Sequence, residues 1–220
     1  FIFKRRNYKQ TTIFLFMKAI KNIIFDLGGV LLDIDTGKTN EAFEKLGVAD
    51  FKKNYSLQKA DTLFDELEKG KLTEMEFYTG IRKISGLPIA DNDIRDAWNA
   101  LILDFRTESL RYLEQLKHRY DLYLLSNTNS IHYTAFHRHF RTQTGREDFD
   151  DHFTKAYYSH HLGLRKPERE IYQFTLQDAG IVAAETLFID DLLKNIDAAA
   201  LLGINTYHLQ AGERIENIRF

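Results

Sequence analysis

The sequence predicts an α/β protein: a three-layer, Rossmann-like parallel sheet with a helical cap inserted after the first strand. Short buried strands alternate with amphipathic helices along most of the chain, as in parallel sheets covered on both faces. The alternation stops between residues 36 and 105, where the patterns are helical. We therefore divide the chain into an N-terminal extension (1–20), an α/β core domain (21–35 and 106–220) and a helical cap domain (36–105).

Five short apolar segments predict the strands of the core. They are Asn22–Phe25, Asp121–Leu125, Thr154–Tyr158, Thr186–Ile189 and Asn205–His208. Between them, helical spacing of apolar residues predicts helices at Thr107–Arg119, Glu168–Ala179 and Leu192–Leu202. Thr107 is a residue type that caps helix N-termini. Gly180 and Gly203 follow the last two helices, where glycine commonly ends a helix.

The interval from 36 to 105 is too long for a crossover loop between two neighbouring strands. Its capping-box pattern Thr73–Glu76 predicts the start of one helix. Asp91 is expected to cap the helix that carries Trp98. We interpret the interval as a small helical insert over the site, with an aromatic core made of Phe43, Phe51, Tyr55, Phe64, Phe77, Tyr78 and Trp98.

Charge and composition exclude several classes of protein. The 220 residues carry a formal net charge of -2, so no overall basic field favours nucleic acid or an anionic membrane. Cysteine is absent, which excludes disulfides, thiol nucleophiles and thiolate metal sites, and favours a reducing compartment such as the cytoplasm. No apolar run approaches the roughly 18 residues of a membrane-spanning helix.

The first residues, FIFKRRNYKQTTIFLF, place basic side chains before a short apolar patch. A secretory signal has this order, but Lys18 interrupts the patch and no small-residue cleavage site follows. We expect residues 1–16 to be an extension and Met17 to be the natural start.

Polar side chains follow the predicted strands at the points where the strands end. They are Asp26, Ser126, Asn127, Lys166, Asp190, Asp191 and Asn195. Because the carboxyl ends of parallel strands lie at one edge of a sheet, we expect these residues to meet there. Carboxylates, a lysine and a hydroxyl suit a phosphate and a hard divalent cation such as Mg²⁺. Glycines after Asp26 let backbone N–H groups approach a phosphate.

Each of these residues has an ordinary structural explanation when taken singly. Asp26 could cap a turn, Ser126 and Asn127 could form one, and Lys166 could be a solvated charge. Their joint placement at strand ends favours a functional site. Pro167 is typical of the first turn of a helix, so we expect Lys166 at a helix N-terminus, where anions are stabilised.

Four segments carry a family resemblance. FDLGGV, LLSNTN, LRKPE and FIDDLLKN resemble, in order and spacing, the four motifs of the haloacid dehalogenase superfamily, whose largest group is phosphatases. The resemblance extends from Ile23 to Tyr207, and the helical insert resembles the cap of that family. Within the superfamily, the pattern is similar to the subgroup that contains bacterial alpha-D-glucose-1-phosphate phosphatase.

The resemblance implies a role for each matching residue. Asp26 would be the nucleophile that forms an aspartyl phosphate, and Lys166 would stabilise it and the transferring phosphoryl group. The phosphate of the substrate would be bound by Leu27, Gly28, Ser126, Asn127 and Lys166. Mg²⁺ would be held by Asp26, the Gly28 carbonyl and Asp191, with Asp190 and Asn195 in support.

Gly28 departs from many phosphatases of the superfamily, which have an aspartate there as general acid and base. A positioned acid–base group is worth about 10² to 10⁴ in rate. An anomeric sugar oxygen leaves more easily than an ordinary alkoxide and needs less help from an acid. Asp33, Asp35 and His132 are the candidate substitutes.

The sequence therefore predicts a Mg²⁺-dependent phosphatase acting on a small phosphorylated metabolite, with sugar phosphates as one candidate class. The alternatives are a non-catalytic member of the fold that binds a phosphorylated ligand or a protein, and a dehalogenase. Asp26, Lys166 and Asp191 together favour the enzyme, and a dehalogenase would not need the acidic pair. Five of the eight histidines stand in two groups without metal-ligand spacing and are interpreted as structural, surface or pocket-lining residues: His132, His137, His139, His160 and His161.

Overall fold

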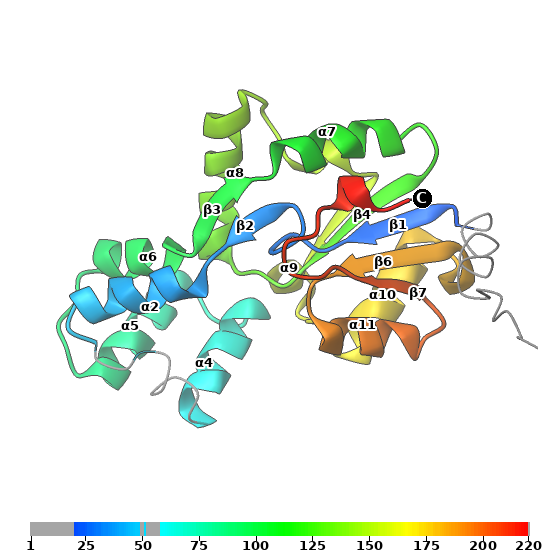
Figure 1. Cartoon of the computed structure of the whole chain (residues 1–220). Helices are drawn as coiled ribbons and strands as arrows, with labels where there is room; N and C mark the ends of the chain where they lie inside the picture. The colour runs from blue at the N-terminus through cyan, green and yellow to red at the C-terminus, as the bar shows by residue number, and fades with distance from the viewer. Residues whose placement is uncertain (1–19, 49–50, 52–57, 220) are drawn as a thin grey trace, which may run out of the picture.

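The structure is a computed structural model that describes residues 20–48, 51 and 58–219 (Figure 1). The predicted N-terminal extension, apart from Ile20, lies outside the described residues, and so does Tyr55. Within the described ranges, no helix is both long enough and apolar enough to cross a membrane.

A five-stranded parallel sheet forms the centre of the core. Its strands are β1 (Asn22–Phe25), β4 (Asp121–Ser126), β5 (Lys155–Tyr158), β6 (Thr186–Asp190) and β7 (Asn205–His208). They lie in the order β5-β4-β1-β6-β7, so β1 is central and each neighbouring pair is parallel. The predicted fold class is confirmed, and each predicted strand agrees with the observed one to within one residue at either end.

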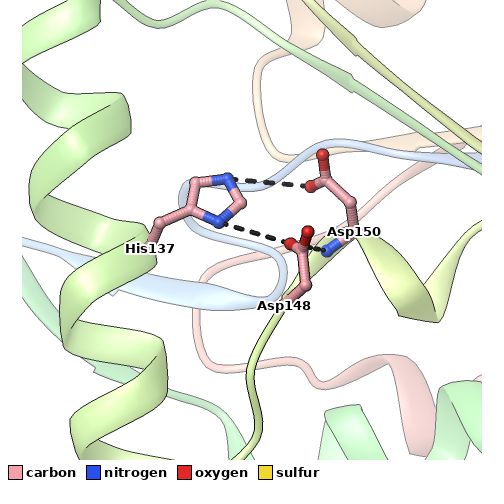
Figure 2. Close-up of side chains that lie close together, drawn as sticks. All are labelled: His137, Asp148 and Asp150. Atoms are coloured by element: carbon pink, nitrogen blue, oxygen red, sulfur yellow. Dashed lines mark hydrogen bonds and ion pairs between the residues drawn. The ribbon is translucent and has the colours of Figure 1, made fainter.

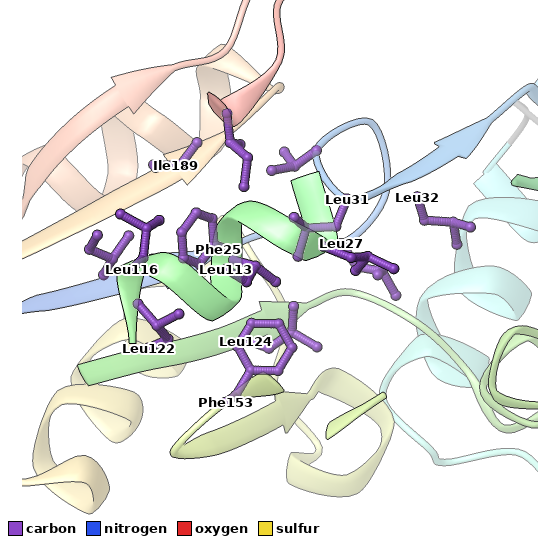
Figure 3. Close-up of a cluster of buried hydrophobic side chains, with 14 of the residues drawn as sticks. Phe25, Leu27, Leu31, Leu32, Leu113, Leu116, Leu122, Leu124, Phe153 and Ile189 are labelled. Carbon is purple, nitrogen blue, oxygen red and sulfur yellow. The ribbon is translucent and has the colours of Figure 1, made fainter. Parts of the chain in front are cut away.

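Successive side chains of each strand point to opposite faces of the sheet, and helices cover both of these faces. Phe25 of β1 and Leu124 of β4 lie in one apolar cluster with side chains of α7 (Thr107–Leu116) and α8 (Ser130–Thr144), which Figure 3 shows in part. Ile24 lies in the opposite cluster with α10 (Arg169–Ala179) and α11 (Leu193–Ala200). These two apolar clusters, one on each face of the sheet, hold the carboxyl ends of the strands in fixed relative positions. Short helical elements also occur along the core sequence: η1 (Asp150–His152), α9 (Ser159–Leu162), η2 (Ala183–Glu185) and η3 (Ile215–Asn217).

Three residues predicted to lie at or near helix N-termini are displaced from the predicted position by one or two residues, although the predicted start of the helix at Thr107 is confirmed. Helix α7 begins at Thr107 itself, and its N-cap is Arg106. Helix α6 (Asp91–Asn99) has Ala90 as its N-cap, while the Asp91 carboxylate pairs with Arg82 at 2.5 Å. Helix α10 begins at Arg169, so Pro167 precedes the helix rather than occupying its first turn. For Asp91, a nearby guanidinium competes successfully with the backbone N–H groups of the helix.

Four helices of the predicted cap pack around a separate apolar cluster. They are α2 (Thr36–Lys45), α4 (Gln58–Glu68), α5 (Glu74–Ser85) and α6. Aromatic rings stack within this cluster, with 4.0 Å between the centroids of Phe43 and Phe51 and 5.0 Å between those of Phe64 and Trp98. The Thr73 capping box is present, because the Thr73 hydroxyl accepts from the Glu76 N–H at 3.2 Å and the Glu76 carboxylate accepts from the Thr73 N–H at 2.8 Å.

The prediction that residues 36–105 are helical throughout is wrong at the end of the interval. Strand β3 (Ile102–Phe105) pairs antiparallel with β2 (Leu32–Ile34), which was not predicted either. These strands are short, and their pairing joins the segment that enters the helical insert to the one that leaves it, so no local periodicity reveals it. We propose that this two-stranded ribbon is the boundary between core and cap.

The sheet core makes a prediction about stability. Leu124 is fully buried in β4, whereas Leu201 is 88% exposed. Leu124→Ala should lower the free energy of unfolding by about 2–5 kcal/mol, because it removes buried methyl groups and leaves a cavity. Leu201→Ala should change it by less than about 0.5 kcal/mol. Urea unfolding followed by circular dichroism measures both, and equal effects would contradict the assignment of β4 to the core.

Candidate active site

Asp26 and the acidic pair of β6 meet at the carboxyl end of the sheet. Phe25 lies opposite Ile189 in the parallel register, and the Asp26 N–H donates to the Ile189 carbonyl at 2.9 Å. The next residue of each strand therefore brings Asp26 beside Asp190. The sequence predicted this convergence, and the register of β1 and β6 produces it.

Lys166 lies between these two carboxylates. Its Nζ is 2.7 Å from Asp26 Oδ1 and 2.7 Å from Asp190 Oδ2. The lysine is 1% exposed, and the Asp190 side chain is fully buried. A buried ammonium is tolerated only where opposite charges and hydrogen bonds replace its water. The attraction of both carboxylates outweighs the burial and raises the pKa of Lys166, so the side chain stays charged.

Two asparagines hold this arrangement in place. The Asn127 side chain, just after β4, accepts from the Lys166 N–H and donates to the Lys166 carbonyl, both at 2.8 Å. The Asn195 amide donates to both oxygens of Asp190 at 3.0 Å. The Leu192 N–H donates to Asp190 Oδ1 at 2.8 Å. Asn127 therefore positions the loop that carries Lys166, a role that its motif did not indicate.

Ser126 ends β4 and is 3% exposed. Its hydroxyl lies 3.5 Å from the Asn127 carbonyl, at the long limit for a hydrogen bond. The Ser159 hydroxyl fixes the loop that follows, because it accepts from the Thr128 N–H at 2.9 Å and donates to the Thr128 carbonyl at 2.8 Å. Sequence reasoning missed Ser159, since nothing local relates it to Thr128.

The loop after Asp26 must pass very close to Asp191. Gly29 has a φ of +73°, and a Cβ built on it would lie 2.2 Å from Asp191 Oδ2. A side chain at this position would therefore strain the backbone and displace the carboxylate. Leu27, which follows the nucleophile candidate, is 3% exposed and packs in the apolar cluster of the sheet.

The carboxylates of Asp26, Asp190 and Asp191 each offer an oxygen within 4.8 Å of the others. Burial raises the pKa of Asp26 to about 7; Lys166 opposes the rise, and Asp190 and Asp191 add to it. Burial, and then Asp190, raises the pKa of Asp191 as well. One ammonium cannot neutralise three carboxylates, so the cluster attracts a further cation. Its donors are all oxygens, which fits Mg²⁺.

An acidic side chain at Gly28, which the resemblance implies for many phosphatases, would require the tip of the Ile34 side chain to shift. A Cβ at Gly28 would lie 3.1 Å from the Cδ1 of Ile34, which is closer than ordinary van der Waals contact. The Ile34 side chain of β2 therefore occupies the space beside Gly28. Chain topology explains this, since β2 folds back over the turn that follows Asp26.

The three candidate substitutes for that acid all have other partners. Asp33 Oδ1 accepts from the Arg106 guanidinium at 2.7 Å, and Asp35 Oδ1 accepts from the Gly37 N–H at 2.8 Å as the N-cap of α2. The two ring nitrogens of His132 lie 3.0 Å from the Asn129 amide and 3.0 Å from the Trp98 carbonyl. Burial lowers the pKa of His132 to about 4. His132 therefore links α8 to the cap as a neutral imidazole.

The cap also reaches the loop that carries Lys166. The Arg165 guanidinium pairs with Asp65 and, at 2.9 Å, with Glu68 of α4. Burial raises the pKa of Glu68 to about 7, although Lys194 and Lys166 favour its ionised form. Sequence reasoning missed Glu68, because only the docking of α4 against the core brings it near these lysines.

These features define a class of protein. The family model that describes haloacid dehalogenase-like hydrolase sequences matches residues 20–203 of this chain. Two curated relatives are similar along most of their length. A D-ribitol-5-phosphate phosphatase of Bacteroides thetaiotaomicron is 36% identical, over 88% of this chain and 93% of its own. A sesquiterpene phosphatase of Aspergillus oryzae is 30% identical, over 87% of this chain and 90% of its own.

Solved structures of similar proteins have the same fold. A haloacid dehalogenase family enzyme of Bacteroides thetaiotaomicron is 40% identical over 88% of this chain and 95% of its own, with a TM-score of 0.83. An aspartate-to-alanine mutant of that enzyme, solved with magnesium and inorganic phosphate, has a TM-score of 0.82 at 39% identity, over 88% of this chain and 96% of its own. A family member from Porphyromonas gingivalis is 33% identical over 89% of this chain and 93% of its own, with a TM-score of 0.80.

The chain belongs to the haloacid dehalogenase-like hydrolase family. The predicted superfamily is confirmed, and with it the prediction of a hydrolase. Both curated relatives are phosphatases by name, and neither carries the name of the glucose-1-phosphate subgroup.

The contact at Gly29 gives a sharp test of the site. Gly29→Ala should reduce kcat/KM at least tenfold, because the new methyl group must displace Asp191. Gly86→Ala is a matched control, since Gly86 has a φ of +70° and a Cβ added there would have nothing within 4 Å. The control should cost only the backbone strain of about 1–2 kcal/mol in stability and leave kcat/KM unchanged. Equal losses of activity in the two variants would contradict a role for the close approach.

Proposed function

We propose that the protein is a Mg²⁺-dependent phosphatase that hydrolyses a small phosphorylated sugar or sugar alcohol. The observation that carries this proposal is the placement of Lys166 between Asp26 and Asp190, with Asp191 alongside. The arrangement supplies a carboxylate nucleophile, a fixed positive charge for phosphoryl oxygens and an oxygen-only cation site. Phosphoryl transfer depends mainly on such positioning and charge stabilisation.

In the proposed reaction, Asp26 Oδ attacks phosphorus in line with the leaving oxygen. The bond to the leaving group breaks, the leaving oxygen takes a proton from solvent water, and an aspartyl phosphate forms. A water molecule then attacks phosphorus and gives up a proton to solvent, which releases phosphate and regenerates the Asp26 carboxylate. Lys166 orients Asp26 and stabilises charge on the transferring group. Mg²⁺, held by Asp26, Asp191 and the Gly28 carbonyl, would lower the repulsion between the carboxylates and the anionic substrate.

Several observations support catalysis over simple ligand binding. Lys166 is buried with two carboxylates, and Asn127 and Asn195 bind both sides of this group. A binding protein gains little from a buried nucleophile paired with a buried lysine. The relatives are named as phosphatases, and a related structure was solved with magnesium and phosphate.

The contacts between cap and core support a polar substrate. Charged side chains lie where α4 meets the Lys166 loop, namely Asp65, Glu68, Lys69, Arg165 and Glu168. Hydroxyl groups of a sugar or polyol can hydrogen-bond with such groups, whereas a terpenoid chain would have to desolvate them. This favours the substrate class of the bacterial relative over that of the fungal one.

The first test of the proposal is phosphate release from p-nitrophenyl phosphate with and without Mg²⁺. Asp26→Asn should abolish turnover, because an amide cannot act as the nucleophile. Asp191→Asn should raise the Mg²⁺ concentration for half-maximal activity at least tenfold, because a ligand has been lost. Glu170→Gln, which removes an exposed carboxylate on α10, serves as the control. Turnover by Asp26→Asn, or unchanged Mg²⁺ dependence in Asp191→Asn, would contradict the assigned roles.

The glycine at position 28 predicts a steep dependence of rate on the leaving group. An unassisted leaving oxygen carries its own negative charge in the transition state, so aryl and anomeric phosphates should react much faster than simple alkyl phosphates that make no contacts with the cap. A polyol phosphate has an alkoxide leaving group too, so its rate should exceed that of a simple alkyl phosphate only through binding of its hydroxyl groups. The measurement is kcat/KM across phosphates of graded leaving-group pKa, including sugar 1-phosphates, D-ribitol 5-phosphate and a terpenyl phosphate.

The same series of kcat/KM measurements on the Glu68→Gln variant tests whether Glu68 donates a proton to the leaving group. A flat dependence in the wild type that becomes steep in Glu68→Gln would contradict the prediction and assign the proton to Glu68. Preference for the terpenyl phosphate would overturn the sugar or polyol class while leaving the phosphatase proposal intact.

A further inference from the structure

A second group of potential metal ligands lies away from the cluster formed by Asp26, Asp190 and Asp191. His137 projects from α8, and Asp148 and Asp150 lie on the segment between α8 and β5 (Figure 2). We propose that these three side chains bind a divalent transition-metal ion, with Zn²⁺ as the ion best suited to them.

The two carboxylates lie on either side of the His137 ring edge, each beside a different ring nitrogen, and an ion would bind one of these nitrogens. His137 Nδ1 is 3.5 Å from Asp148 Oδ1, and His137 Nε2 is 3.8 Å from Asp150 Oδ1. Each residue offers a ligand atom within 4.8 Å of the other two. The Asp150 N–H donates to Asp148 Oδ1 at 3.0 Å, and Asp150 accepts a hydrogen bond from the Tyr158 hydroxyl. These bonds orient the two carboxylates toward the ring before any ion is present.

The imidazole of His137 gives an independent reason to expect a ligand. The residue is 7% exposed, and its Nε2 has no hydrogen-bond partner within the part of the chain that the structure describes. Buried polar atoms are nearly always paired with protein, water or an ion. This nitrogen faces Asp150 at a separation longer than a hydrogen bond, which is compatible with an ion that both groups share.

The charges at this cluster leave room for a divalent cation. Asp148 and Asp150 can carry one negative charge each, and both face the single imidazole of His137. One ring can balance at most one of these charges, whereas a divalent ion balances both.

The donor set indicates the class of ion. One imidazole nitrogen and two carboxylate oxygens suit Zn²⁺ and its neighbours, whereas Mg²⁺ prefers oxygen alone. The Asp148 side chain is 53% exposed, so the site is open to solvent on one side. Water can complete the coordination shell there, and the ion has a path of entry.

An ion at this position would cross-link α8 to the segment that leads into β5, because its ligands come from both. Helix α8 also carries Ile131, which packs in the cap cluster, and His132, which contacts the Trp98 carbonyl. Binding should therefore raise thermal stability. The inference does not depend on the proposed phosphatase activity, because it uses none of the residues assigned to that reaction.

The test is Zn²⁺ binding to the full-length, metal-stripped protein in phosphate-free buffer. The Asp191→Asn background weakens binding by the acidic cluster, so that the new site can be counted. Titration against a chromophoric chelator should give one Zn²⁺ per chain, and saturating Zn²⁺ should raise the melting temperature. Excess Mg²⁺ should not displace the ion.

Variants assign the ion to its ligands. His137→Gln and Asp148→Asn, each in this background, should weaken Zn²⁺ binding about tenfold or more, since even outer partners of metal ligands are worth 10–100-fold. Asp148→Asn alters an exposed side chain and should fold normally. His139→Gln is the matched control, because His139 lies on the same helix, is more exposed and faces Asp104 at 3.2 Å. Co²⁺ bound in place of Zn²⁺ should show a visible absorption band that His137→Gln removes.

The possible outcomes separate clearly. Tenfold weaker binding in the two ligand variants, with the control unchanged, supports the site. Absence of Zn²⁺ binding in the Asp191→Asn protein overturns the proposal, and so does equal affinity in Asp148→Asn and His139→Gln. The cluster would then be a structural histidine–carboxylate ion pair.

Discussion

The buried ammonium of Lys166 is the constraint on which the rest of the site depends. A charge that is 1% exposed needs fixed partners, and Asp26 and Asp190 provide them at 2.7 Å each. The carboxylates come from two adjacent strands, so the register of β1 and β6 sets their separation. Asn127 then fixes the lysine loop from a third strand. Buried ion pairs contribute little to stability compared with apolar packing of the same volume, so this arrangement is best explained by its chemistry.

An excess of carboxylate over ammonium gives the site its affinity for a cation. Burial and mutual repulsion raise the pKa of Asp26 and Asp191, and a divalent ion would relieve both effects. Close packing enforces the excess, because Gly29 lets Asp191 approach the loop that follows Asp26. The same physical rule applies at His137, where two carboxylates face a buried imidazole. The two clusters differ in their donors, oxygen alone in one and mixed nitrogen and oxygen in the other, so we expect them to select different ions.

Helices of the predicted cap contact the core next to the loop that carries Lys166. Arg165, next to Lys166, pairs with Asp65 and Glu68 of α4, and His132 joins α8 to the carbonyl of Trp98. A change in the position of the cap would therefore act directly on the lysine loop. In the proposed function, the charged boundary would contact a hydroxyl-rich leaving group, and Glu68, whose pKa burial raises to about 7, lies at this boundary.

Local patterns in the sequence were sufficient for the five strands of the parallel sheet and for the convergence of Asp26, Lys166 and Asp190, because buried strands appear as apolar runs and parallel strands end at one edge. Other features depend on residues far apart in the chain that meet only after folding. The pairing of β2 with β3, the bonds from Asn127 to Lys166, and the nearness of Glu68 to the lysines are of this kind. So are the partners that occupy Asp33, Asp35 and His132, and the approach of His137 to Asp148 and Asp150. The sequence alone determined which chemical groups lie at the ends of the strands. The tertiary structure decided which of those groups are already paired and which can still bind a ligand, because pairing depends on distances that no local pattern encodes.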